Sequence, residues 1–333
     1  MTGIFEQLNY RLYLPGGNMT ALVAGIETDA ARRRAIQDYI MGGRRDVEQV
    51  GFVGDVNSDP ALIMTGGEFC GNAARAAAWY YLGGRPGEIA MRVSGAGGAI
   101  RAGVDGALNA WVEIPADKCV VIPVAEGVRR VEMEGITHFV VSAGASEKYL
   151  AVLSGEDGAA RLLRRAGELL RALAGATEPA RPPSIGLAGL AIDAPAAVGV
   201  VFTEYITASD VPDTNKTASA FLYCGDETDR YVKIHPCVFV QSAGTAFYET
   251  ACGSGSAAVA VAECAERVER VERGYNAESD KSTACGKNTA CGKNVKLALL
   301  QPSGMTIEAS AAIAGDRVSS VIISGPITEI PIG

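Results

Sequence analysis

Two short segments, one in each half of the chain, place a Cys-Gly pair directly before an alanine-rich stretch with helical spacing. They are Met64–Ala78 and Phe247–Ala258. In each segment a small polar residue, Asn72 or Ser254, follows the Cys-Gly pair and can serve as the N-cap of the helix. The repetition predicts one such helix start in each of two domains, for which 333 residues are sufficient.

The rest of the chain interleaves strands and helices without strict alternation, which predicts an α+β fold with mixed sheets in two halves. Helices are expected at Asp29–Met41, Asn72–Leu82, Asp157–Ala174 and Ser254–Glu272. Strands are expected twice within Arg11–Thr28, around a turn at Pro15–Asn18, and at Val50–Val53, Ala61–Met64, Ile89–Val93, Ala99–Val104, Ala107–Ile114, Val128–Glu134, Ile136–Ser142, Ala197–Ile206, Val232–Gln241, Val295–Leu300, Thr306–Ala312 and Arg317–Gly325. A Pro-rich loop is expected at Glu178–Pro183.

Composition limits the compartment and the partners. The formal charge of −8 argues against nucleic acid as a partner, although helix N-termini can still bind a small anion. No apolar run is long enough for a membrane span, and the first ten residues lack the pattern of a signal peptide. We therefore expect a cytoplasmic protein whose eight cysteines are mostly reduced.

A thiol at a helix start has a chemical meaning. The exposed N–H groups and the positive end of the helix dipole are expected to lower its pKa, and the same N–H groups can hold a carboxylate. If Cys70 and Cys252 face each other across a cleft, one thiolate can remove a proton from a carbon and the other thiol can return one on the opposite face. A single buried cysteine near a helix start is more often a packing residue, but two matched contexts favour catalysis. Four cysteines without this context are expected to be structural: Cys119, Cys224, Cys237 and Cys264.

The segments Gly66–Ala73 and Thr250–Gly255 resemble the signature segments of the diaminopimelate epimerase superfamily, the cofactor-independent two-cysteine racemases and epimerases. The first segment is closer in sequence to the histidine racemase branch, which is associated with metallophore synthesis. Short correspondences in family order extend the resemblance over most of the chain: Gly17-Asn18, Glu48-Gln49, Thr137–Val140 and Phe239–Gln241.

The resemblance implies a fold of two pseudo-symmetric domains, each a mixed sheet or barrel wrapped around a central helix. It divides the chain into residues 1–124 and 125–315, with 316–333 as a final strand that returns to the first domain. It also implies a homodimer, an amino acid as the small-molecule ligand, and neither a metal nor an organic cofactor.

The resemblance further implies roles for individual residues. Cys70 and Cys252 would be the acid/base pair. The other expected site residues would bind or orient the substrate: Gly71, Asn72, Gly253 and Ser254 at the helix starts, Asn18 on the substrate, Gln49 and Glu249 on the thiols or the α-amino group, and His138, which is equally well read as a core residue. His235 has no motif and is expected to be structural.

Three positions depart from the pattern of diaminopimelate epimerases. Ile136 and the neighbourhood of Pro236 stand where that family has asparagines, and Thr250 stands where it has an arginine. The lost polar groups bind the distal end of the substrate, so the chemistry looks retained while the side-chain pocket looks changed.

These observations favour a pyridoxal-independent amino-acid racemase, with histidine as the first substrate to test. The alternatives are a diaminopimelate epimerase and a non-catalytic amino-acid-binding protein on the same scaffold. A thiol redox protein is disfavoured because the sequence has no Cys-x-x-Cys. A tandem duplication, 283–288 and 289–294, is either a thiol or metal loop using Cys285 and Cys291 or, as we favour, an expanded polar loop.

Overall fold

The computed structural model describes residues 8–173, 197–207, 211, 231–240, 245–272 and 294–332. Within these ranges the strands form one continuous sheet, in the order β1-β2-β3-β4-β5-β6-β7-β16-β15-β14-β12-β11-β10-β9-β8, with β13 added to β12 and a further pairing of β1 with β16. Parallel pairs such as β2–β3 and β10–β11 occur beside many antiparallel ones. The prediction of a mixed-sheet α+β fold is confirmed.

The strands have the following bounds: β1 Tyr10–Pro15, β2 Thr20–Ala24, β3 Gln49–Val53, β4 Ala61–Met64, β5 Gly87–Val93, β6 Ala99–Val104, β7 Asn109–Glu113, β8 Val120–Ala125, β9 Val128–Met133, β10 Ile136–Val141, β11 Ala197–Ile206, β12 Tyr231–Val240, β13 Thr245–Tyr248, β14 Asn294–Leu300, β15 Thr306–Ala314 and β16 Arg317–Ile330. The helices are α1 Ala30–Gly43, α2 Gly71–Leu82, α3 Ala143–Leu150, α4 Gly158–Leu173 and α5 Gly253–Glu272, with a short 3-10 turn at Ala151–Leu153.

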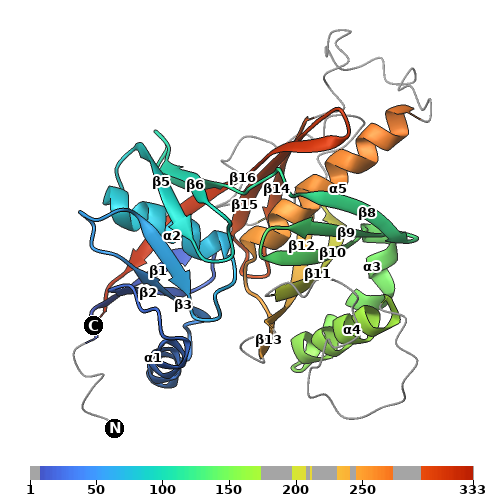
Figure 1. The fold of residues 1–333 in the computed structure, drawn as a ribbon. Helices are drawn as coiled ribbons and strands as arrows, with labels where there is room; N and C mark the ends of the chain where they lie inside the picture. Colours follow the sequence, from blue (N-terminus) through green and yellow to red (C-terminus); the bar gives the residue numbers. More distant parts are fainter. Residues whose placement is uncertain are drawn as a thin grey trace.

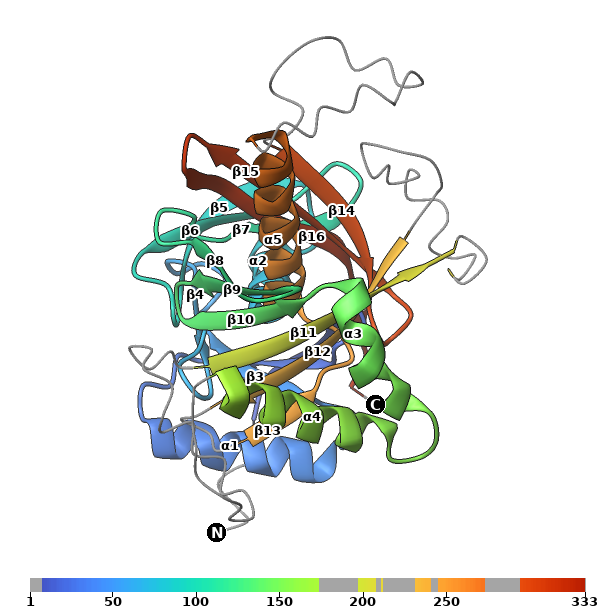
Figure 2. The ribbon, with the colours of Figure 1, turned by 90° about the vertical axis from the view of Figure 1, so that its right-hand side faces the viewer.

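Two helices, α2 and α5, are each enclosed by strands (Figures 1 and 2). The helix α2 packs against β1, β2, β5, β6 and β7, and α5 packs against β10, β14, β15 and β16. Their alanines are fully or almost fully buried, because small side chains let the strands approach from several sides. One hydrophobic core contains residues of both helices and of the strands around them.

Two other helices, α1 and α4, lie on the outside of the sheet (Figure 2). The helix α1 begins at the predicted cap Asp29, whose carboxylate accepts from the N–H of Arg32 at 2.8 Å. The helix α4 buries only one apolar stripe, which includes Leu162, Ala166 and Leu170, against a second core. No helix in the described ranges has the length and apolarity that a membrane crossing requires.

Three elements were not predicted from the sequence: β8, α3 and β13. The strand β8 contains Pro123, lies at the edge of the sheet and shifts register between Pro123 and Ala125, so its pattern resembles a loop. The helix α3 is short, and its N-cap residue, Ser142, makes no side-chain capping hydrogen bond. Such elements are stabilised by tertiary packing, which leaves little signal in the local sequence.

Candidate active site

The sulfur atoms of two cysteines cap the two enclosed helices. Cys70 stands directly before α2 with an extended backbone, and its Sγ accepts a hydrogen bond from the N–H of Ala73 at 3.4 Å. Cys252 stands in the same position before α5, and its Sγ accepts from the N–H of Gly255 at 3.2 Å. Each sulfur therefore occupies the position of an N-cap acceptor.

The prediction that Asn72 and Ser254 cap these helices is wrong. Each of them is the second residue of its helix. The free N–H of the third residue donates instead to the sulfur of the cysteine that precedes the helix. The side chain of Asn72 is used differently: its Nδ2 donates to the carbonyl of Ala251 at 2.9 Å. This hydrogen bond ties the start of α2 to the start of α5.

Two glycines allow the helix starts to touch. A Cβ on Gly71 would lie 2.5 Å from Cδ1 of Ile323, and a Cβ on Gly253 would lie 2.8 Å from the same atom. The latter would also lie 3.1 Å from the backbone N of Asn72. A side chain at either position would push the two helix starts apart.

Both cysteines line one cavity of about 40 Å³ at this contact. Eight of the ten predicted site residues lie on its wall: Gln49, Cys70, Gly71, Asn72, Glu249, Cys252, Gly253 and Ser254. The remaining wall is Glu68 and five apolar residues: Phe69, Ile136, Ala197, Val238 and Val240. The cavity has room for about one water molecule, which is less space than an amino acid occupies.

A chain of hydrogen bonds leads from Cys70 into the first strands. Its thiol donates to Oε1 of Gln49 at 2.9 Å. The Nε2 of Gln49 donates to Oδ1 of Asn18 and, at 2.8 Å, to Oγ1 of Thr20. Nδ2 of Asn18 then donates to Glu48 at 2.8 Å. Asn18 thus lies behind Gln49 and not on the cavity wall.

Glu48 continues this chain to the second cysteine segment. Its carboxylate accepts from the hydroxyl of Thr250 and, at 3.3 Å, from the N–H of Thr250. The next residue back, Glu249, lies beside the thiol of Cys252, and its carboxylate raises the pKa of that thiol. Polar contacts therefore surround both sulfur atoms.

His138 lies behind Ser254, outside the cavity wall. It is fully buried, and its Nε2 lies 2.9 Å from the Oγ of Ser254, which is 3.5 Å from the sulfur of Cys252. Burial lowers the pKa of His138 to about 3, so the imidazole is neutral. A Cβ on Gly199 of the neighbouring strand would lie 2.1 Å from Nδ1, so only glycine leaves room for the ring. His138 is a core residue that also contacts the site through Ser254.

Burial controls the ionisation of both thiols. It raises the pKa of Cys70 to about 12 and that of Cys252 well above the ordinary thiol value. The N–H groups of Ala73 and Gly255 act in the opposite direction, but they are outweighed by desolvation and by the nearby Glu249 carboxylate. The helix starts therefore act on these pKa values in the expected direction, but burial reverses the net shift. Burial also raises the pKa of Glu249 to about 8.

Sequence reasoning assigned no role to three residues that the fold brings to the site: Glu48, Glu68 and Gln301. Gln301 is fully buried, and its Oε1 accepts from the N–H of Cys252 at 3.0 Å. Glu48 and Glu68 belong to motif segments, but only the fold shows that both approach the second cysteine segment. Gln301 follows a strand and carries no motif that could have revealed it.

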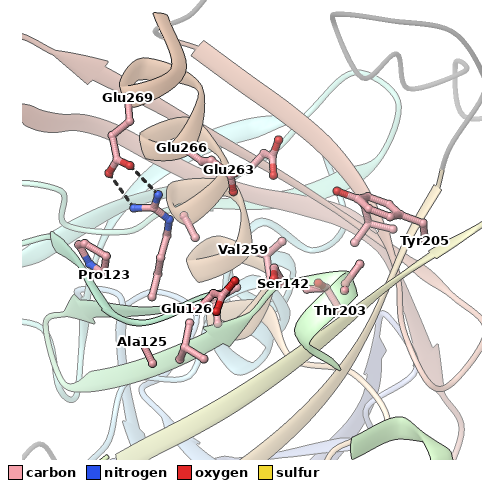
Figure 3. A pocket seen from close by; sticks show the side chains of 18 of the residues that line it. Pro123, Ala125, Glu126, Ser142, Thr203, Tyr205, Val259, Glu263, Glu266 and Glu269 are labelled. Carbon is pink, nitrogen blue, oxygen red and sulfur yellow. Dashed lines mark hydrogen bonds and ion pairs between the residues drawn. The ribbon is translucent and has the colours of Figure 1, made fainter. Parts of the chain in front are cut away.

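A larger cavity, of about 600 Å³, lies elsewhere, between β8–β9 and α5 (Figure 3). Arg129 and Glu269 form an ion pair in it, with two contacts of 2.8 Å. None of the predicted site residues lines this cavity. No cluster of metal-ligating side chains was found within the described ranges.

The cysteines predicted to be structural are buried where the structure describes them: Cys119, Cys237 and Cys264. His235 is also buried and bridges Tyr248 and Glu204, at 2.8 and 2.9 Å. Several expectations lie outside the described residues: Cys224, Gln241, the loop at 178–183 and the duplicated loop with Cys285 and Cys291.

Comparison with known proteins gives two kinds of match. Residues 7–154 match the model of the N-terminal domain of the histidine racemase CntK. Over 73 residues the chain is 37% identical to the histidine racemase of Staphylococcus aureus strain Mu50, a match that covers 20% of this chain and 26% of that protein. The chain therefore spans about a quarter of the length of this curated relative.

Solved structures match over almost the whole chain. A hydroxyproline epimerase from Agrobacterium vitis with bound trans-4-hydroxy-L-proline has a TM-score of 0.51 at 12% identity and covers 97% of this chain and 91% of its own. A probable proline racemase from Agrobacterium radiobacter K84 with bound carbonate has a TM-score of 0.50 at 12% identity, with 98% and 93% covered. The chain shares the fold of these two proteins. The match to the histidine racemase domain includes Cys70, whereas Cys252 lies beyond the matched residues.

Proposed function

We propose that this protein is a cofactor-independent amino-acid racemase in which Cys70 and Cys252 exchange a proton at Cα. The observation that carries the proposal is that both thiols, each at the start of an enclosed helix, line one cavity. The match to a histidine racemase domain and the fold shared with a hydroxyproline epimerase support it.

The helix starts would bind the α-carboxylate of the substrate. The backbone N–H groups of the first turn of α2 and of α5 converge on the contact between Gly71 and Gly253. N–H groups at a helix start, together with the helix dipole, favour an anion, and here two helices contribute. The same groups would stabilise the negative charge that spreads onto the carboxylate when Cα loses its proton.

Proton removal requires one ionised thiol. Glu249 lies beside the Cys252 thiol, and its raised pKa of about 8 makes it a suitable acceptor for the thiol proton. The Cys252 thiolate then takes the Cα proton, and the Cys70 thiol gives its own proton to the opposite face. The reverse direction begins from Cys70, whose thiol contacts Gln49.

Histidine is the first substrate that we propose. The matched domain model and the curated relative are both histidine racemases. Diaminopimelate is the second candidate from the same chemistry, but Ile136 lines the cavity as an apolar residue where epimerases of that kind have a polar one. An amino-acid-binding protein without catalysis is the alternative of another class.

The test is racemisation of L-histidine and LL-diaminopimelate by the purified protein, followed by chiral chromatography. Cys70→Ser and Cys252→Ser should each lose about 10²–10⁴-fold in kcat, because each removes one of two groups that transfer protons. Cys119→Ser changes a buried cysteine outside the cavity and serves as the matched control. Calorimetric binding of an amino acid without any turnover would instead favour the binding protein.

We also propose a division into two domains, residues 1–124 and 125–315, with 316–333 returning to the first. The pairing of β16 with β1 and β7 supports the return of the last strand. Because β8 pairs with β9, we would draw the first boundary a few residues earlier, before Val120. A homodimer is part of the same proposal and is testable by light scattering.

A further inference from the structure

Glu68 belongs to the turn that leads into α2, and this turn is held firmly. The hydroxyl of Ser94 donates to the carbonyl of Glu68 at 2.9 Å. Gly95, with φ of +77°, packs so closely that a Cβ there would lie 2.3 Å from the N of Phe69. Burial raises the pKa of this carboxyl group, and the nearby N–H groups of Gly66 and of Glu68 itself act in the opposite direction. The backbone at Glu68 is therefore held in place by its packing.

One oxygen of this carboxylate has no partner. Oε2 of Glu68 is shielded from solvent and makes no hydrogen bond to any described residue. Arg33 acts on the pKa of this carboxyl group from nearby, but its guanidinium donates to three backbone carbonyls: those of Thr65, Glu27 and Thr28. A buried carboxylate oxygen without a partner is costly, so a ligand that supplies a donor would gain from it.

Glu68 also joins two cavities. It lines the cavity between the cysteines and a second one of about 50 Å³ next to it. The two cavities share four residues: Gln49, Glu68, Val240 and Glu249. The second cavity extends to Gln37 and Met41 of α1 and to Phe247 of β13. With the α-carboxylate at the helix starts, a substrate side chain would extend past Glu68 into this second space.

The charges along both cavities are of one sign. Glu48, Glu68 and Glu249 line them, and no lysine, arginine or histidine of the described residues does. Glu48 is satisfied by Thr250 and Asn18, and Glu249 lies beside the Cys252 thiol. An amino acid with a neutral side chain brings one cationic group, its α-ammonium. A basic amino acid brings a second cationic group on its side chain, which can pair with Glu68. A second carboxylate would find no cation.

We propose that Glu68 is a specificity residue that accepts a hydrogen bond from a basic nitrogen on the substrate side chain, as in histidine or lysine. This inference rests on the proposed racemase function. In this proposal the two cysteines carry out the proton transfer, and Glu68 determines which substrate side chains are bound. A substrate whose side chain ends in a carboxylate is accordingly excluded.

The test compares kcat/KM for L-histidine and L-lysine with that for L-norleucine, and uses α-deuterium exchange to detect slow substrates. In Glu68→Gln we expect kcat/KM for the basic substrates to fall about 10- to 100-fold, mainly through KM, because a charged hydrogen bond is weakened. The value for L-norleucine should stay within about twofold, and L-2-aminoadipate should not react. The control is Glu126→Gln, an exposed glutamate on the larger cavity, which should leave all values unchanged.

The outcomes separate the two proposals. A wild-type protein that exchanges the α-proton of no amino acid overturns both. If the wild type is active and Glu68→Gln lowers kcat/KM for basic and neutral substrates equally, or changes neither value, the role of Glu68 is overturned. The racemase function would still stand. Unchanged circular dichroism and melting temperature would confirm that Glu68→Gln is folded.

Discussion

At the scale of single residues, burial raises the pKa of both thiols that line the small cavity. Cys70 and Cys252 accept hydrogen bonds from backbone N–H groups, which favour the thiolate. Both are also buried beside carboxylates, which disfavour it. In the proposed mechanism, the ammonium group of a substrate beside Glu249 would offset the effect of this carboxylate on the Cys252 thiol.

Glu249 gives a prediction about stability and pH. Its folded-state pKa, about 8, lies above its ordinary value of 4.5, so the folded protein binds this proton more tightly than the unfolded chain. The corresponding stability is fully present below pH 4.5 and is lost as the pH rises through 8. Relative to Glu249→Gln, the wild type should therefore lose up to about 4 kcal/mol of unfolding free energy between pH 4.5 and pH 9.

Urea unfolding of both proteins at pH 5 and pH 9 measures this difference. An exposed glutamate changed in the same way, Glu147→Gln, controls for the loss of one surface charge. If the wild type and Glu249→Gln differ in unfolding free energy by the same amount at both pH values, the raised pKa of Glu249 is contradicted.

Much of the site was predictable at this scale, because cysteines before glycine-rich helix starts are recognisable in sequence. Gln49 and Glu249, which line the cavity, were found through family resemblance. Gln301 could not be found in this way, because its role depends on β14 ending beside the start of α5. The direction of the thiol pKa shifts was also unpredictable, since burial depends on every element that packs around the sulfur.

At the scale of elements, the contact between the starts of α2 and α5 determines the site. Gly71 and Gly253 both face Ile323 of β16, and Asn72 bridges to Ala251. Any residue that widens this contact changes the separation of the two thiols. Catalysis by positioned groups is sensitive to displacements of about 1 Å.

Gly253→Ala tests this contact. The added methyl would meet Ile323 at 2.8 Å and Asn72 at 3.0–3.1 Å, so we expect a loss of about 1–3 kcal/mol in stability and at least tenfold in kcat. The matched control is Gly167→Ala in α4, where the nearest atom is Nη1 of Arg171 at 3.8 Å and the helix should gain up to about 1 kcal/mol. Full activity in Gly253→Ala would show that the two helix starts need not touch.

Elements with strong periodicity or clear turn residues were predicted well. The long amphipathic helix α4 and the strand β11 fall where the pattern places them. The elements that were missed, β8, α3 and β13, depend on pairing or packing with distant parts of the chain. Local sequence cannot report such partners.

At the scale of the whole molecule, the sheet is continuous and connects the surroundings of α2 with those of α5. The strand β16 pairs with β7 and β1, which belong to the surroundings of α2, and also with β15, which packs against α5. One hydrophobic core contains residues from both regions. The described structure should therefore unfold as one cooperative unit.

The two tryptophans, Trp79 and Trp111, make this testable, because both lie in the first part of the chain. Tryptophan fluorescence reports that part, while far-ultraviolet circular dichroism reports all helices and strands. We expect the two urea transitions to coincide. Separate midpoints would mean that the two regions unfold independently.

The most direct test of the central claim is racemisation of L-histidine in D2O, followed by NMR and mass spectrometry at early times. With two thiols on opposite faces, the returning hydrogen comes from a group that has exchanged with solvent. The product D-histidine should carry one deuterium at Cα from the first turnovers, while the remaining L-histidine keeps its proton. Deuterium entering L-histidine as fast as D-histidine, or a product that retains the original proton, would contradict a two-thiol mechanism at Cys70 and Cys252.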